Sequence, residues 1–131
     1  MRHNTLNTSI PPFRRHSTLA VILALHLALA AAPADATNVS ECQDLVQDLK
    51  VQTQVVPIYG QRADQDRAGL LGKLDGCGVK LDQGKPQDAI AKLTDYRSKV
   101  ISLTTSGHMS QADAHLLVAG SDAAISCIQG I

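Results

Sequence analysis

Apolar residues in this 131-residue chain recur every three or four positions through most of its length beyond residue 40, which is the spacing of amphipathic α-helices. Four such stretches are separated by short segments containing proline or glycine. No stretch alternates apolar and polar residues for long enough to predict a β-strand. The pattern therefore predicts an all-α protein, most simply a small four-helix up-and-down bundle.

The first predicted helix runs from Glu41 to about Val55. Ser40 and Gln43 have the spacing of a capping box at its start. Pro57 ends it, because proline disfavours helical geometry in the residue before it. The apolar residues of its predicted core face are Cys42, Leu45, Val46, Leu49 and Val56.

The second predicted helix runs from Ala63 to about Gln83. Its predicted face alternates by fours and threes through Ala63, Arg67, Leu70, Leu74, Cys77 and Leu81. Each glycine inside a helix costs about 1 kcal/mol relative to alanine. We expect close approach of a neighbouring backbone to compensate at four glycines: Gly69, Gly72, Gly76 and Gly78.

The third predicted helix runs from Pro86 to about Thr105. Gly84 suits the left-handed position after a helix and Pro86 the first position of the next, so the second and third helices should form an antiparallel hairpin. The predicted core face of the third helix carries Ala89, Ile90, Leu93, Val100 and Ile101. Gly107 ends this helix.

The fourth predicted helix begins after Ser110, which forms a capping pair with Asp113, and continues to the end of the sequence. Met109 stands where a hydrophobic staple would act. Gly130 and Ile131 fit a C-terminal cap. The predicted core face of this helix carries Ala112, Leu116, Ala119, Ala123 and Cys127.

The N-terminal segment has the composition of a secretory signal peptide. Arg14 and Arg15 precede an apolar run from Leu19 to Ala32, and small residues follow up to Ala36. The run is about 14 residues long, short of the roughly 20 that span a bilayer. We therefore expect a signal peptide over 1–36, a single domain over 37–131, a secreted or periplasmic location, and no stable membrane anchor after cleavage.

Charge and aromatic content limit the classes of partner that we expect the mature domain to bind. Cleavage would take three basic residues and one acidic residue from a balanced total of 12 and 12, which leaves a formal charge of −2. This balance gives no electrostatic reason to expect a nucleic acid or an anionic lipid. Only Tyr59 and Tyr96 could stack on a base or a sugar, and Tyr59 more plausibly covers the top of the bundle.

Three cysteines in an exported chain of about 95 residues favour one disulfide and one remaining thiol. Alternating helix direction brings Cys42, Cys77 and Cys127 toward the same end of the bundle. Cys42 and Cys127 match best in height and lie on neighbouring helices, so this pair is favoured, although the other two pairings stay open. Cys77 would then be the odd thiol, either buried or available for a disulfide-linked dimer.

Candidate chemistry is sparse in this sequence. Soft and imidazole ligands occur close together in the sequence at His108, Met109, Asp113 and His115. The two histidines lie about two helical turns apart, however, so these residues make only a weak metal site. Asp64 begins an incomplete calcium-loop pattern. An acidic side chain that interacts favourably with the helix dipole at the start of a helix explains this residue better. No nucleophile motif or phosphate-binding loop is present, so we expect neither enzymatic activity nor a cofactor.

The middle of the chain resembles the FIMAH domain, a small helical module of bacterial exported proteins. The resemblance is strongest in three segments: Ala68–Asp75, Lys80–Lys85 and Asp88–Leu93. It continues more weakly, so that it covers roughly Leu45 to Ile128. This resemblance implies a non-catalytic role and no site residues. Such modules are often appended to extracellular enzymes, whereas we expect this one to stand alone.

The sequence thus predicts an exported, non-catalytic module that mediates protein interaction or structural support in the envelope or the extracellular space. Its partner would be a protein whose identity the sequence does not give. A different possibility is a small-ligand or metal carrier with a cavity between the third and fourth helices. A third is a structural module that dimerises through its remaining thiol.

Overall fold

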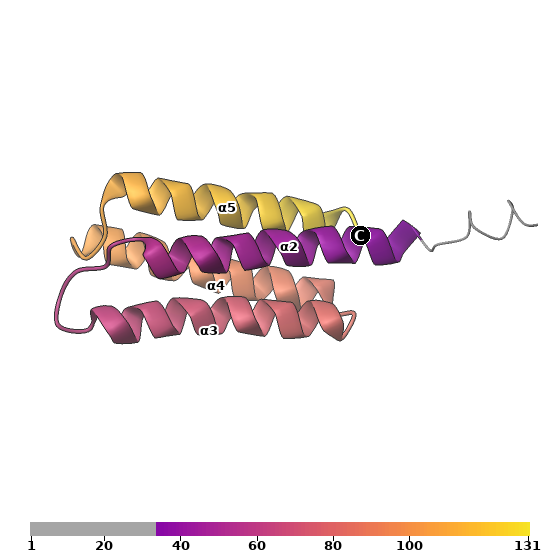
Figure 1. The fold of residues 1–131 in the computed structure, drawn as a ribbon, viewed down its shortest axis with the longest axis horizontal. Helices are drawn as coiled ribbons and strands as arrows, with labels where there is room; N and C mark the ends of the chain where they lie inside the picture. Colours follow the sequence, from indigo (N-terminus) through magenta and orange to yellow (C-terminus); the bar gives the residue numbers. More distant parts are fainter. Residues whose placement is uncertain (1–33) are drawn as a thin grey trace, which may run out of the picture. The chain divides into compact units, whose positions relative to one another are not determined.

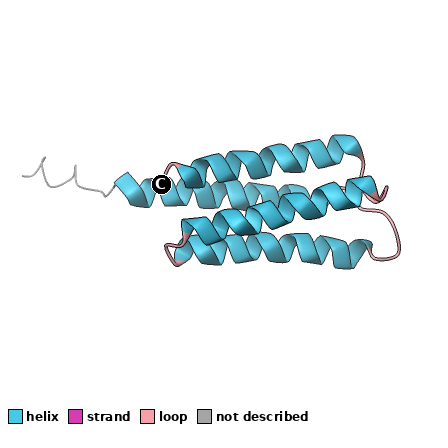
Figure 2. Ribbon diagram, turned by 180° about the vertical axis from the view of Figure 1, so that it is seen from behind, coloured by secondary structure: helices cyan, strands magenta, loops and turns pink. Residues whose placement is uncertain are grey.

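The computed structural model describes residues 34–131, and these form four antiparallel helices joined by short loops (Figure 1). The helices are α2 (Ala34–Val55), α3 (Ala63–Asp82), α4 (Pro86–Thr105) and α5 (Gln111–Gln129). Each packs against two neighbours in a ring, α2 on α3, α3 on α4, α4 on α5 and α5 on α2. The view from behind shows only helices and loops in this part of the chain (Figure 2). The predicted all-α up-and-down bundle is confirmed.

The expected signal peptide lies mostly outside the described residues, including its whole apolar run from Leu19 to Ala32. The expected cleavage point after Ala36 falls in the first turn of α2. This helix begins well before the predicted start at Glu41, so the capping box at Ser40 and Gln43 is wrong. Nothing between Ala34 and Ser40 breaks a helix, and alanine has the highest helix propensity, so the helix extends upstream of Ser40.

The remaining helix boundaries follow the predicted chemistry closely. Gly84 adopts a φ of +65° after α3, and Pro86 is the first residue of α4. Gly107 adopts a φ of +76° after α4. Ser110 caps α5, because its hydroxyl accepts a hydrogen bond of 3.1 Å from the backbone N–H of Asp113. These positions confirm the hairpin between α3 and α4 and the capping pair of α5.

The core is built from one stripe of buried residues on each helix, spaced by threes and fours so that all four stripes meet along the bundle axis. The stripes are Cys42, Val46, Leu49 and Thr53 on α2; Leu70, Leu74, Cys77 and Leu81 on α3; Ala89, Leu93, Tyr96, Val100 and Leu103 on α4; and Ala114, Leu117, Ser121, Ala124 and Ile128 on α5.

The stripe on α5 differs from the predicted one. The expected face through Ala112, Leu116, Ala119, Ala123 and Cys127 points largely outward, and Leu116 is half exposed. Alanine, serine and glycine occur on every side of this helix, so periodicity alone did not locate the buried side. On α4, Ile101 is likewise half exposed, while Tyr96 and Leu103 are buried.

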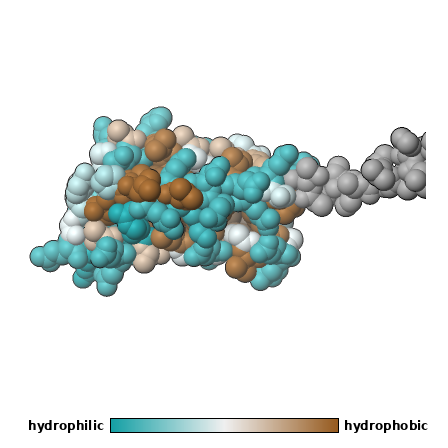
Figure 3. Space-filling model, in the orientation of Figure 1, coloured by the Kyte–Doolittle hydropathy of each residue, from teal (hydrophilic) through white to brown (hydrophobic). Residues whose placement is uncertain are grey.

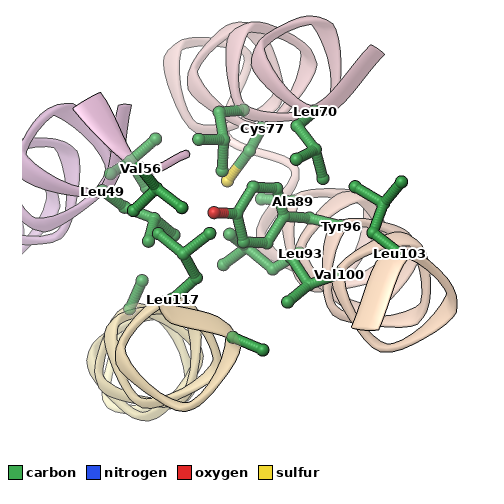
Figure 4. Packing of buried hydrophobic residues seen from close by; sticks show 14 of the residues in the cluster. Leu49, Val56, Leu70, Cys77, Ala89, Leu93, Tyr96, Val100, Leu103 and Leu117 are labelled. Carbon is green, nitrogen blue, oxygen red and sulfur yellow. The ribbon is translucent and has the colours of Figure 1, made fainter. Parts of the chain in front are cut away.

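Tyr96 has the largest fully buried side chain of the bundle. Its ring lies at the centre of the core, with the hydroxyl directed across toward α2 (Figure 4). There the hydroxyl is 2.7 Å from Oγ1 of Thr53, which in turn donates a hydrogen bond of 2.7 Å to the carbonyl of Leu49. Since Thr53 uses its proton on Leu49, Tyr96 must be the donor in the other bond. Burial raises the pKa of Tyr96 to about 12, and the bond to Thr53 partly opposes this rise.

Arg67 fixes the end of α2 from the first turns of α3. Its Nη1 atom donates hydrogen bonds of 2.8, 2.7 and 3.0 Å to the carbonyls of Thr53, Gln54 and Val56. Carbonyls at the end of a helix lack intrahelical partners and carry the negative end of the helix dipole, so a guanidinium is well suited to them. The arginine that the sequence placed on the seam thus links two helices by polar contacts.

The expected close approach at the glycines of α3 is wrong. A Cβ atom added at Gly69, Gly72 or Gly78 would meet nothing within 4 Å, and one at Gly76 would touch only the aliphatic part of Lys92. The close approach occurs instead on α5. A Cβ at Gly120 would lie 3.0 Å from Cδ1 of Leu49 and 3.4 Å from Oε1 of Gln52.

This difference predicts opposite effects of alanine at two glycines. Gly72→Ala should raise the free energy of unfolding by about 0.5–1 kcal/mol, because alanine reduces the backbone freedom of the unfolded chain and meets no neighbour. Gly120→Ala should lower it by about 1 kcal/mol, because Leu49 is fixed in the core and cannot give way cheaply. Urea unfolding measures both values, and equal stabilisation by the two variants would contradict the close packing at Gly120.

The bond between Thr53 and Tyr96 predicts an asymmetric pair of variants. Tyr96→Phe should cost about 1 kcal/mol, because Thr53 keeps its bond to Leu49. Thr53→Val should cost more, up to about 3 kcal/mol, because the Tyr96 hydroxyl is then buried without its acceptor. The double variant should cost less than the sum of the two. Additive costs in a double-mutant cycle would show that the two hydroxyls are not coupled.

Candidate functional site

The disulfide joins Cys42, near the start of the packed part of α2, to Cys127, in the last turns of α5. The two sulfur atoms are 2.03 Å apart and the Cα atoms 5.5 Å apart. This is the pairing that helix height favoured from the sequence. The two cysteines are 85 positions apart in the sequence, and the segment between them contains all of α3 and α4.

Cys77, the remaining thiol, is fully buried in the core beneath α3. The predicted burial of the odd thiol is confirmed. Burial raises its pKa from an ordinary value of 9.0 to about 11. Because the thiolate is the reactive form and no surface is exposed, a disulfide to a second chain would require the core to open first.

The histidines proposed as metal ligands are not brought together with a complete ligand set. Met109 is buried, Asp113 accepts a hydrogen bond of 2.6 Å from the Ser110 hydroxyl, and His115 is exposed on α5. His108 lies in the loop before α5, with Nδ1 3.3 Å from the Ser106 hydroxyl. Within residues 34–131, no group of three or more histidine, cysteine, aspartate or glutamate side chains could hold a metal ion.

The loop end of the bundle is held by contacts between the α2–α3 and α4–α5 loops. The backbone N–H of Tyr59 donates a bond of 2.8 Å to the carbonyl of His108, whose ring lies over Gly60. The Tyr59 side chain is half exposed, so it does not seal the bundle top. At the start of α3, Asp66 forms an ion pair of 2.6 Å with Lys99 of α4, while Asp64 is exposed. The ion pair gives Asp66 a structural role at the start of α3.

A shallow groove of about 420 Å³ runs between α2 and α3. Val46 and Leu74 contribute to its lining, and Gly78 leaves it open because it has no side chain. An ion pair of 2.6 Å between Lys50 and Asp75 crosses it. A hydrogen bond of 2.5 Å from Gln43 to Asp82 also joins the two helices. The charged groups along the groove therefore already have partners.

The solvent-facing side of α2 carries a second regular stripe, opposite its buried one. We call this stripe the outer face of α2. Its members, all exposed, are Glu41, Asp44, Asp48, Val51 and Val55. They recur at intervals of three, four, three and four residues, so they lie in one line along the helix. The line is acidic in its first half and apolar in its second.

An apolar patch extends from this stripe to the neighbouring helix. Hydrophobic surface gathers over the second half of α2 and the adjoining part of α5 (Figure 3). The half-exposed or more exposed apolar residues on these elements are Val51, Val55 and Leu116. Gly120 packs on Leu49 and Gln52, so Leu116, one turn earlier on α5, lies beside the next turn of α2. Val51 and Val55 lie one turn apart on α2, and Leu116 lies on the neighbouring helix; we call these three exposed residues the apolar patch.

The sequence carries a signal for this surface that the predicted core faces do not include. The core stripe of α2 and its outer face both follow the same spacing, and the predicted face covers only the core stripe. Val51 and Val55 do not fit the spacing of Val46 and Leu49. Apolar residues out of phase with a core stripe are the signal that would have located the face. Leu116 could not be placed, because it was assigned to the core.

None of the helices in the described part of the chain is long and apolar enough to cross a membrane. No protein-family model, curated protein or solved structure matches this chain. The resemblance to the FIMAH domain accordingly stays a prediction.

The buried thiol of Cys77 predicts a pH-dependent term in stability. Its pKa is raised in the folded state, so this contribution is complete below about pH 9 and is lost as pH rises toward 11. The expected loss is about 2–3 kcal/mol, measured by urea unfolding across this range. Cys77→Ala should lack the term, while the tyrosine contribution above pH 10 should remain in both proteins. Parallel pH curves for the two proteins would contradict a buried thiol.

Proposed function

We propose that this protein is an exported, non-catalytic module that binds another protein of the envelope or the extracellular space through its apolar patch. The patch of Val51, Val55 and Leu116 is the observation that carries this proposal. Side chains on helices that are packed on both sides lose little freedom on binding, so apolar groups held this way suit recognition. Exposed apolar residues that gather on one surface commonly mark an interaction site.

Two further features support the location and the class. The pattern of basic, apolar and small residues before Thr37 is typical of an export signal, and a disulfide is favoured in oxidising compartments. The non-catalytic part of the proposal rests on the sequence, in which no nucleophile motif was found. The groove between α2 and α3 is open and its charged groups already have partners, Lys50 with Asp75 and Asp82 with Gln43, so it does not favour a carrier function.

Site-specific photo-crosslinking in cells that export the protein tests this proposal. A benzophenone amino acid at position 51 should give a discrete adduct with one protein, because this position lies in the apolar patch. The matched control is position 101 on α4, where Ile101 is exposed to a similar extent, 54% against 51% for Val51. This position should give no such adduct.

Equal labelling from both positions, or no adduct from position 51, would contradict a binding role for the patch. A Val55→Ser change should remove the adduct from position 51, since it removes adjacent apolar surface. Thermal unfolding should be nearly unchanged by this substitution, because Val55 is 75% exposed.

A further inference from the structure

We propose that the outer face of α2 binds an amphipathic α-helix of the partner, with apolar residues over Val51 and Val55 and with lysine or arginine opposite the acidic half. This inference rests on the proposed function and names the class of partner. It is carried by the order of charge along the face rather than by the apolar patch alone.

The acidic half of the face lacks neutralising groups of its own. Glu41, Asp44 and Asp48 are exposed, and none takes part in the ion pairs found among residues 34–131. The nearest basic residue on α2, Lys50, is turned toward α3 and pairs with Asp75. The surface next to the two valines therefore carries an uncompensated negative charge.

Helix stability does not account for these acids. The favourable effect of an acidic side chain on the helix dipole fades beyond the first turn, and Asp44 and Asp48 lie well inside α2. Like charges three or four residues apart on a helix instead destabilise it. Both successive spacings, from Glu41 to Asp44 and from Asp44 to Asp48, are of this kind. A bound cationic partner would remove this cost.

A straight helix is the shape that fits this face. The five residues lie along about 21 Å of one helix, so a partner helix of about 15 residues would cover them. Its apolar residues would follow the same spacing of threes and fours to meet Val51, Val55 and Leu116. A second copy of α2 does not fit, because parallel docking sets acids against acids and antiparallel docking sets acids against valines. An anionic membrane is disfavoured by the same charges.

The test uses the disulfide-bonded protein and a synthetic helical peptide of about 18 residues. The peptide carries leucines on one face of its first half and lysines on the same face of its second half, which suits antiparallel docking and its own helix dipole. A second peptide replaces these lysines with glutamate. Titration calorimetry measures affinity, and amide chemical shifts locate the bound peptide.

We expect the lysine peptide to bind and to shift the amides of the outer face of α2. Asp48→Lys should weaken its binding about tenfold and improve that of the glutamate peptide, because the charges are exchanged on both sides. The matched control is Asp95→Lys on the exposed side of α4, which should change either affinity by less than about twofold. Both substitutions are at exposed positions, and thermal unfolding checks that each variant is folded.

Three results would overturn the proposal: equal binding of the two peptides, shifts located away from α2, or no binding of the lysine peptide at about 1 mM. If the adduct from position 51 forms while the lysine peptide fails, this inference is wrong and the proposed function stands. If the peptide binds as expected and no adduct forms in cells, the recognition chemistry stands and the cellular role is wrong.

Discussion

The hydrogen-bonded tyrosine at the centre of the bundle is the constraint around which the other core residues are arranged. Among residues 34–131, Tyr96 supplies the one aromatic ring in a core otherwise made of aliphatic, small and sulfur-containing side chains. Its hydroxyl needs a partner once it is buried, and Thr53 provides it from α2. This bond links two helices, α2 and α4, that are not neighbours in sequence. The leucine and valine side chains of the four helices converge around the Tyr96 ring (Figure 4).

Most helix boundaries could be predicted because they depend on the covalent chemistry of single residues. Gly84, Pro86 and Gly107 impose backbone angles or remove a donor wherever they occur. The prediction of where α2 starts was wrong for the converse reason. Ser40 resembles a cap by spacing, but a cap forms only where the helix would otherwise end. The prediction of the buried side of α5 was wrong because small residues occur on every side of that helix and carry almost no directional signal.

The candidate site could be predicted only in part, because it depends on relations between helices. The disulfide followed from helix direction and height, which a sequence provides once the topology is known. The hydrogen-bond partner of Tyr96 could not be predicted in this way, because Thr53 and Tyr96 belong to the periodic patterns of two different helices. The apolar patch requires knowing which side of α5 is exposed, and that side was assigned in reverse. The acidic half of the outer face, by contrast, was present in the sequence as a second regular stripe.

The position of the disulfide gives the protein a mechanical property. Tension applied to the chain upstream of residue 42 and downstream of residue 127 would pass directly through the bond between Cys42 and Cys127. The segment between these cysteines would carry no load, so pulling from outside it could not unravel the core. The span between the two attachment points would stay near the 5.5 Å that separates their Cα atoms. A partner held by α2 would therefore face an unchanged surface under strain until the bond is reduced.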